Sequence, residues 1–452
     1  MVKFRPIRNV EATVPVQKID LLICPRWIVP IVPRGAVLHD HAIAVDAGKI
    51  ADVLPAAEAP GRYRAARTVR LPDHAVMPGL VNLHTHAAMS LLRGFADDLP
   101  LMRWLQEKIW PAEGRWLSAD FVRAGTLLAA AEMLRGGTTC CQDMYFFPEA
   151  AAEAFCEAGM RAVLGIAVLE FPTPYAADAA DYLAKGIATR DRHRDNPALT
   201  FTLAPHAPYT VSDASFMRIA TLSAQLGLPV QIHLHETRQE VADSLGQFGV
   251  RPLARLDRLG LVGPDLIAIH GVHLNGDDMA LLGGHGASLA HCPTSNMKLA
   301  SGAAPVAEAL RGGVRVGLGT DGAASNNRLD MFQEMRHAAL LGKLTAGDAS
   351  ALDAHTVLRM ATLAGAEALG LGDLVGSIES GKRADLCAIR LDDWMLQPCF
   401  DPAAHLVYVA GREHVSHVWV NGKSVVSESQ FDDMDVAKLA ASARLWQNRL
   451  GS

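Results

Sequence analysis

Two hydrophobic patterns alternate along the middle of the chain. Short apolar runs of strand length, such as residues 77–83 and 266–269, are separated by Ala- and Leu-rich stretches with helical spacing, such as residues 121–135 and 214–226. Strand and helix alternate in this way over roughly 300 residues, which predicts a parallel α/β sheet, either open or closed.

The two ends of the chain have a different pattern. Residues 17–76 and 384–428 hold short β-rich segments separated by Pro, Gly and Asp, and Asn421-Gly422 is a strong signal for a hairpin turn. Because these similar ends flank a single α/β region, we expect them to meet in one small β domain. The predicted organisation has four parts: the N-terminal part of a β-sandwich in residues 1–76, an α/β barrel in 77–383, the C-terminal part of the sandwich in 384–428 and a helical segment in 429–452.

Several apolar runs of the middle region end on side chains that can bind a metal ion. Residues two apart on a strand point to the same side, so such side chains can face one interior. A barrel whose inward residues become polar at the carboxyl ends of its strands has the layout of a TIM-type active site. The side chains concerned are, in chain order, His84, His86, His233, His235, Glu236, His270 and Asp321.

The intervals between these residues favour a closed barrel. The steps from His86 to His233, from His233 to His270 and from His270 to Asp321 fit four, one and two βα units of ~30 residues. This spacing places the residues on strands 1, 5, 6 and 8. The predicted fold class is therefore α/β, a distorted TIM (β/α)8 barrel with a small β-sandwich formed by both chain ends.

The same residues predict a metal centre that performs hydrolysis. Zinc takes three or four nitrogen, sulfur or oxygen ligands and leaves one position open for catalysis. His84 and His86 share a strand face, and His233 and Asp321 can complete the set. A metal ion in such a site lowers the pKa of a bound water to ~7.

Hydrolysis also needs groups that carry protons from the water to the leaving group. Glu236 and His270 stand at strand ends and are the candidates. Strand parity does not separate His233 from His235. Both therefore stay open as the third nitrogen ligand at this point.

Composition and charge exclude several other classes. A net charge of −6 and a pI near 6.3 leave no basic surface for nucleic acid. No apolar run reaches the ~18 residues that a membrane span needs. The N-terminus has no apolar core followed by a cleavage site, and the seven cysteines lack paired spacing. We therefore expect a cytoplasmic enzyme that contacts neither nucleic acid nor membrane.

The motifs resemble the amidohydrolase superfamily. The resemblance begins with Met77-Pro78-Gly79-Leu80 ahead of the first histidine pair, continues with H-x-x-E and ends on the turn GTDG at 319–322. Within the superfamily, the chain is similar to the 5′-methylthioadenosine/S-adenosylhomocysteine deaminase group, in the branch shared with triazine hydrolases and guanine deaminases. The segments that carry this similarity, between about residues 18 and 428, are LMRWLQEKIWPAE (101–113), Gly137-Thr138-Thr139, APHAPYT (204–210), HCPTSNMKLASG (291–302) and GTDGAASNNRLDMFQEMR (319–336).

The resemblance implies zinc-dependent hydrolytic deamination at C6 of the adenine of 5′-methylthioadenosine, with release of ammonia. Glu236 would pass a proton from water to the ring nitrogen beside C6, and His270 and Asp321 would orient the attack. One zinc ion per subunit would be bound by His84, His86, His233 and Asp321.

The resemblance also implies the contacts with a small nucleoside substrate. Glu113 would bind the ribose hydroxyls, His206 would contact the nucleoside, and Glu236 would contact the base. Superfamily members with two metals carry a lysine at the end of strand 4, and residues 201–208 contain none, so one metal is expected. A homo-oligomer is a further expectation from the resemblance.

One position departs from the group. Members that accept S-adenosylhomocysteine readily carry an arginine after strand 3, where this chain has Glu170. A carboxylate there would repel the homocysteine end by about 1 kcal/mol or more. This favours 5′-methylthioadenosine and adenosine over S-adenosylhomocysteine.

Two other functions stay open at this point. A guanine or oxoguanine deaminase or a triazine chlorohydrolase of the same branch would share the metal site, although a ribose-binding Glu113 favours a nucleoside. A barrel that has lost catalysis and serves as a binding scaffold is the more remote alternative. The presence of all four ligands and both proton carriers argues against a scaffold.

Overall fold

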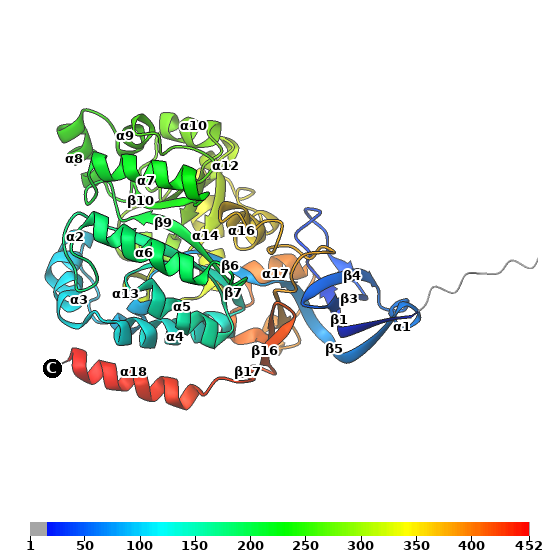
Figure 1. Cartoon of the computed structure of the whole chain (residues 1–452). Helices are drawn as coiled ribbons and strands as arrows, with labels where there is room; N and C mark the ends of the chain where they lie inside the picture. The colour runs from blue at the N-terminus through cyan, green and yellow to red at the C-terminus, as the bar shows by residue number, and fades with distance from the viewer. Residues whose placement is uncertain (1–15, 452) are drawn as a thin grey trace, which may run out of the picture.

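In the computed structural model, which describes residues 16–451, eight parallel strands form a barrel and follow one another in chain order (Figure 1). The first and last strands meet where the backbone N–H of Asp321 donates to the carbonyl of His84 at 3.0 Å. The predicted TIM-type barrel is therefore confirmed. Its strands are β6 (Leu80–Thr85), β7 (Thr138–Tyr145), β8 (Arg161–Val168), β9 (Leu199–Pro205), β10 (Val230–Leu234), β11 (Leu266–His270), β12 (Ser288–His291) and β13 (Arg315–Leu318).

The barrel strands are covered on both sides, which explains why most of their residues are buried. Every residue of β7, β8, β10 and β11 is buried, as expected for parallel strands between a filled interior and a layer of helices. The helices after the strands are α4 (Ala119–Arg135), α5 (Pro148–Ala158), α6 (Ala179–His193), α7 (Asp213–Leu226), α8 (Arg238–Phe248), α9 (Pro252–Arg258), α10 (Gly276–Gly284), α11 (Pro293–Lys298), α12 (Val306–Arg311), α13 (Ala323–Asn326), α14 (Met331–Ala346), α15 (Ala354–Met360) and α16 (Leu363–Ala368).

Local sequence signals set the ends of many of these helices. Ser118 and Asp178 accept hydrogen bonds from backbone N–H groups in the first turns of α4 and α6, which satisfies donors that a helix start leaves free. Gly159 and Gly227 end α5 and α7 in the left-handed conformation, which glycine adopts without steric cost.

An excursion between the first strand and α4 lies at one end of the barrel, at the left of Figure 1 in cyan. It consists of η1 (Ala87–Leu92), α2 (Leu101–Trp104), the π-helical turn η2 (Leu105–Ile109) and α3 (Trp110–Trp116). Trp104, Leu105 and Ile109 are buried, so the excursion packs into the core and is not a loose loop.

The two chain ends meet in one mixed sheet of nine strands, at the right of Figure 1. Antiparallel pairing of β5 with β14 joins the two ends, as the sequence predicted. Leu21 and Ile23 of β1 pack into one apolar cluster, and Ile19 and Leu22 pack into another. The strands are β1 (Gln17–Ile28), β2 (Leu38–His39), β3 (His41–Asp46), β4 (Lys49–Pro55), β5 (Tyr63–Pro78), β14 (Leu386–Arg390), β15 (Val415–Val420), β16 (Lys423–Ser427) and β17 (Gln430–Phe431).

The β domain and the barrel are joined by close packing and one buried ion pair. The only residue between β5 and β6 is Gly79, where a Cβ atom would lie 2.1 Å from the Thr139 side chain. Arg161 of β8 pairs with Asp385, just before β14, at 2.9 Å, and both side chains are buried. These contacts hold the first barrel strand in a defined position relative to the sheet.

Short helices complete the chain. Helix α1 (Ala59–Arg62), η3 (Trp394–Leu396), α17 (Pro402–Tyr408) and η4 (Arg412–His414) lie within or beside the β segments. The last helix, α18 (Val436–Leu450), runs along α4 (Figure 1), and its Trp446 packs edge to face against Phe121. No helix in residues 16–451 is long and apolar enough to cross a membrane.

Candidate active site

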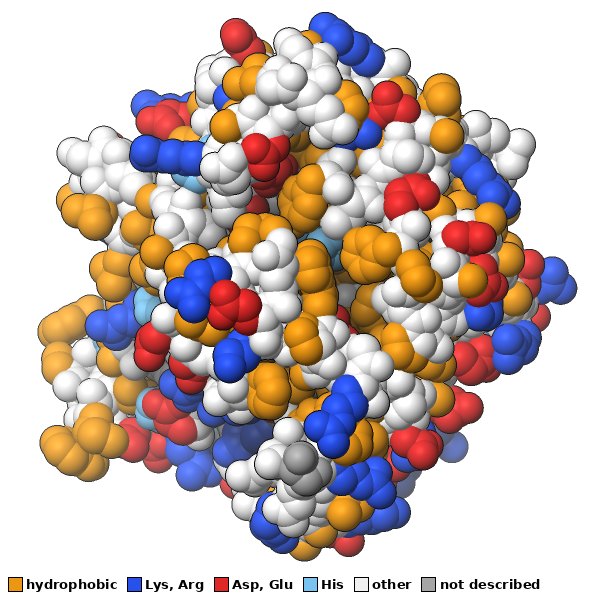
Figure 2. All heavy atoms as spheres, turned by 90° about the vertical axis from the view of Figure 1, so that its left-hand side faces the viewer, with side chains coloured by type: hydrophobic (Ala, Val, Ile, Leu, Met, Phe, Trp, Pro, Cys, Tyr) orange, Lys and Arg blue, Asp and Glu red, His pale blue; other side chains and the backbone are white. Residues whose placement is uncertain are grey.

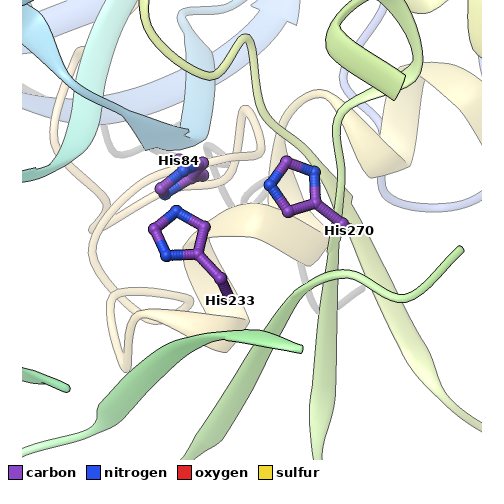
Figure 3. Close-up of side chains that lie close together, drawn as sticks. All are labelled: His84, His233 and His270. Carbon is purple, nitrogen blue, oxygen red and sulfur yellow. The ribbon is translucent and has the colours of Figure 1, made fainter. Parts of the chain in front are cut away.

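The carboxyl ends of the barrel strands bring the predicted metal ligands to one point. The side chains of His84, His233 and His270, from β6, β10 and β11, turn toward one another (Figure 3), with ligand nitrogens within 4.8 Å. His86 and Asp321 form a second group with His84 within the same limit. The other three residues proposed as ligands therefore surround His84, and His270 lies with them.

Backbone carbonyls fix the orientation of two of these histidines. The Nδ1 atom of His86 lies 2.5 Å from the carbonyl oxygen of Met144, and that of His233 lies 2.7 Å from the carbonyl oxygen of His206. A carbonyl only accepts, so each Nδ1–H donates and each Nε2 keeps a free lone pair. This is the usual arrangement for metal-binding histidines.

The ring of His84 is the strongest sign that an ion belongs here. It is fully buried, and neither of its nitrogens has a hydrogen-bond partner of acceptable geometry. Burial lowers the pKa of His84 to about 3, so the ring is neutral. Buried polar atoms are almost always satisfied, and a cation at this point would satisfy one of these two. Imidazole nitrogens with a carboxylate are a donor set that suits zinc.

Asp321 is held in place on both carboxylate oxygens. Its Oδ1 lies 3.3 Å from Nε2 of His84 and 3.2 Å from Nε2 of His86, while its Oδ2 accepts from the hydroxyls of Ser295 at 2.6 Å and Ser325 at 2.7 Å. Burial raises the pKa of Asp321, but the His84 and His86 rings beside its Oδ1 outweigh burial and hold the pKa well below its usual value. The carboxylate is therefore ionised.

The two candidate proton carriers lie beside the cluster. The Oε2 atom of Glu236 is 3.8 Å from Nε2 of His270, and burial raises the pKa of Glu236 above its usual value. The backbone N–H of Glu236 donates to the buried carboxylate of Glu240 at 2.8 Å. Glu236 is thus placed by its own backbone contact, next to the point where the ligands converge.

Strained backbone accompanies these strand ends. His270 and Asp321 have φ values of 70° and 61°, and His235 has 55°. Left-handed conformations in residues other than glycine cost about 1–3 kcal/mol each and cluster at functional sites. Here the strain lies where the chain must turn its polar side chains into the barrel mouth.

A cavity of about 350 Å³ opens from the cluster to the surface. Figure 2 shows this face of the molecule, with hydrophobic side chains gathered around a hollow in which a histidine is visible. His206 and Glu113 line the cavity, as do Glu236, His270 and Asp321. Both residues that the resemblance assigned to the nucleoside are therefore in the same cavity as the metal-binding side chains.

These two residues differ in their surroundings. Burial lowers the pKa of His206 to about 4, and its Nδ1 lies 3.0 Å from the Thr210 hydroxyl. Burial raises the pKa of Glu113 to about 7, although the hydroxyl of Tyr145 donates to its Oε1 at 2.6 Å. In both residues the exclusion of water favours the uncharged form. As a result, His206 is neutral at pH 7, whereas Glu113 changes its charge near that pH.

Glu170 does not occupy the position that the sequence suggested. It is exposed and is not one of the residues that line the cavity, although Leu169 and Phe171 on either side of it are. Its carboxylate accepts the backbone N–H of Ser212 at 2.9 Å, at the start of α7. Helix starts offer unpaired N–H groups that attract carboxylates. The structure thus corrects the prediction: Glu170 stabilises a helix start.

Sequence reasoning did not single out several residues that support the site. Ser295 and Ser325 bind Asp321, and Asn296 accepts from His270 at 2.9 Å. Tyr145 ends β7, so the rule that functional side chains follow barrel strands could have found it. His235 lies behind the site, where its Nε2 accepts the backbone N–H of Leu253 at 3.1 Å.

The barrel, its β domain and the ligand cluster define a metal-dependent hydrolase fold, and the chain belongs to the amidohydrolase family, which it matches over residues 75–425. A protein of Teredinibacter turnerae named 5-methylthioadenosine/S-adenosylhomocysteine deaminase is 46% identical over 434 residues, which cover 96% of this chain and 98% of that protein. A crystal structure of an adenosine deaminase from Xanthomonas campestris with bound zinc is 51% identical, with a TM-score of 0.96 over 97% of this chain and 100% of that one. An atrazine chlorohydrolase from Arthrobacter aurescens, complexed with zinc, is 23% identical with a TM-score of 0.88 over 94% of this chain and 99% of that one, and shares the fold.

Proposed function

We propose that the protein is a zinc-dependent aminohydrolase that converts 5′-methylthioadenosine, and also adenosine, to the inosine analogue and ammonia. The observation that carries the proposal is that two carboxyl groups with different surroundings line one cavity. Glu236 lies beside the metal-binding cluster, and Glu113 lines the same cavity and is held by a tyrosine. The names of the relatives support the same reaction.

Four residues would hold the ion. His84 and His233 offer neutral nitrogens, His86 offers its Nε2, and Asp321 offers an ionised carboxylate. When bound, zinc supplies a water nucleophile that is available at neutral pH. His270 is close enough to the ligands to touch either the ion or that water.

The proton transfers fall to Glu236. As a carboxylate it takes a proton from the attacking water, and it then delivers that proton to the ring nitrogen beside C6. A C6–O bond forms, the C6–N bond to the amino group breaks, and the second water proton leaves with the amino group as ammonia. Burial raises the pKa of Glu236, which makes it a stronger base and suits it to carry the proton in both directions.

The outer wall of the cavity favours a substrate with an apolar 5′ group. Leu101, Leu105, Trp110, Phe171 and Pro172 line it, and none of the described lining residues is a lysine or arginine. The methylthio group is apolar, whereas the homocysteine end of S-adenosylhomocysteine carries a carboxylate. Burying a charge without a partner is costly, so we infer that S-adenosylhomocysteine is the poorer substrate.

The cellular setting is part of the same proposal. All seven cysteines are free of disulfides, which fits a reducing cytoplasm. We also propose that the enzyme is a homo-oligomer, on the basis of the resemblance to its family.

The experiment that tests the reaction is ammonia release from 5′-methylthioadenosine, S-adenosylhomocysteine, adenosine and guanine, each before and after metal removal. We expect zinc-dependent release that is fastest with 5′-methylthioadenosine. Activity on guanine without activity on any adenosine would keep the metal site and replace the proposed substrate. Absence of both metal and turnover would favour the binding scaffold.

A further inference from the structure

Tyr145 joins the barrel wall to the helical excursion at the cavity. It is the last residue of β7, is buried and lines the cavity. Its hydroxyl donates to Oε1 of Glu113, on α3, at 2.6 Å. The bond spans 32 residues of chain, from a fixed barrel strand to a seven-residue helix outside the barrel.

The ring of Tyr145 cannot easily move with its partner. Its ring centroid lies 6.4 Å from that of His86 and 5.3 Å from that of Phe146, and the whole strand is buried. A rigid donor therefore meets a carboxylate on a long, rotatable side chain, and the hydrogen bond determines where that carboxylate points.

The inference that follows rests on the proposed function, in which Glu113 binds the ribose hydroxyls. A carboxylate that accepts two hydroxyl groups must be ionised and held in one orientation. We propose that Tyr145 is a positioning residue that holds Glu113 ready for the 2′- and 3′-hydroxyls of the substrate. The tyrosine occupies one lone pair of Oε1 and leaves Oε2 and the remaining lone pair free for the sugar.

The hydroxyl of Tyr145 also affects the ionisation of Glu113. Burial raises the pKa of Glu113 to about 7, and the hydrogen bond from Tyr145 lowers it. Without that donor the carboxyl group would be protonated more often near neutral pH, and a protonated carboxyl group would accept fewer hydrogen bonds from the sugar.

The test compares two substrates in a single-atom variant, Tyr145→Phe, of the zinc-loaded protein. Adenosine and 2′,3′-dideoxyadenosine share the reacting base and differ only in the hydroxyls that Glu113 would bind. We expect Tyr145→Phe to raise KM for adenosine at least about tenfold, as for loss of a hydrogen bond to a charged group. For dideoxyadenosine we expect a change of less than about twofold, with kcat for both substrates nearly unchanged.

Two further variants separate positioning from general damage. Tyr175→Phe removes a hydroxyl that has no hydrogen-bond partner among residues 16–451, and it should leave both substrates unaffected. In a Glu113→Gln background, Tyr145→Phe should add little to the loss already present, because both residues act on the same hydroxyls.

The outcomes distinguish this inference from the proposed function. An equal loss on both substrates, or a full additional loss in the Glu113→Gln background, would overturn the role of Tyr145 and leave the deaminase intact. A wild-type enzyme that deaminates adenosine and dideoxyadenosine with the same KM would overturn the ribose contact itself. A zinc-loaded wild-type protein that deaminates no adenosine would overturn the proposed function.

Discussion

Asn296 fixes the ring of His270 from behind. The Nδ1 atom of His270 lies 2.9 Å from Oδ1 of Asn296, and both side chains are buried. Because an amide oxygen only accepts, Nδ1 carries the proton and Nε2 points with a free lone pair toward Glu236. The hydrogen bond therefore sets both the tautomer and the direction of a ring that stands beside the reacting water.

Replacing Asn296 by Ala should lower kcat without removing the metal. The His270 ring would lose the Asn296 oxygen that accepts from its Nδ1–H. A proton carrier that is out of place lowers kcat about 10- to 100-fold. The measurement is kcat with zinc content determined on the same sample. Normal kcat with full zinc would mean that His270 is held in place by packing alone.

Glu236→Gln should keep the ion and lose nearly all turnover. The amide has almost the same shape but cannot take up a proton, and general acid–base groups contribute about 10²- to 10⁴-fold. Zinc analysis and single-turnover kinetics with 5′-methylthioadenosine test this. The matched control is Gln239→Glu on the exposed start of α8, which changes charge nearby without touching the cavity. Wild-type activity in Glu236→Gln would remove this residue from the mechanism.

Asp321→Asn and His233→Ala should both abolish turnover, and they should differ in metal content. His233→Ala removes a ligand and should lower zinc content, whereas Asp321→Asn keeps an oxygen in place and loses the charge. Metal removal should also lower the melting temperature of the wild type, because an ion that binds only the folded state stabilises it. The zinc stoichiometry of purified variants, with and without chelator, provides the test. An unchanged zinc content in His233→Ala would point to His270 as the third nitrogen ligand.

The sequence predicted the barrel and the convergence of its candidate ligands because both depend on periodic patterns. His84 and Asp321 stand at the ends of apolar runs, and strand ends of a parallel barrel always meet on one face. Asn296 acts through a contact with His270 on another segment, and nothing in the local pattern distinguishes it from other buried polar residues. Tyr145 stands at a strand end, which is a signal, but its contact with Glu113 cannot be read from spacing. Glu170 was misjudged for a related reason: the direction of a loop side chain depends on the nearby start of α7, which spacing does not reveal.

Substrate preference should respond to Phe171 and not to Glu170. Phe171 lines the cavity and packs edge to face with Trp110 at 6.0 Å, so Phe171→Lys would place a cation where the homocysteine carboxylate would lie. We expect the ratio of kcat/KM for S-adenosylhomocysteine to that for 5′-methylthioadenosine to rise about tenfold. Glu170→Gln is the matched control and should leave the ratio unchanged. A large shift of the ratio in Glu170→Gln, with none in Phe171→Lys, would mean that the carboxylate of Glu170 determines substrate preference.

The pH dependence of nucleoside binding should follow Glu113. Burial raises the pKa of Glu113 from its ordinary value to about 7, so the carboxylate that we propose accepts the ribose hydroxyls is present above that pH and is lost as the pH falls through it. We therefore expect kcat/KM for adenosine to decline below about pH 7 more steeply than kcat/KM for 2′,3′-dideoxyadenosine, which makes no use of this group. Groups that serve the chemistry affect both substrates alike, so the ratio of the two profiles isolates Glu113. In Glu113→Gln the ratio should be independent of pH, and a ratio that still falls in that variant would assign the titration to another residue.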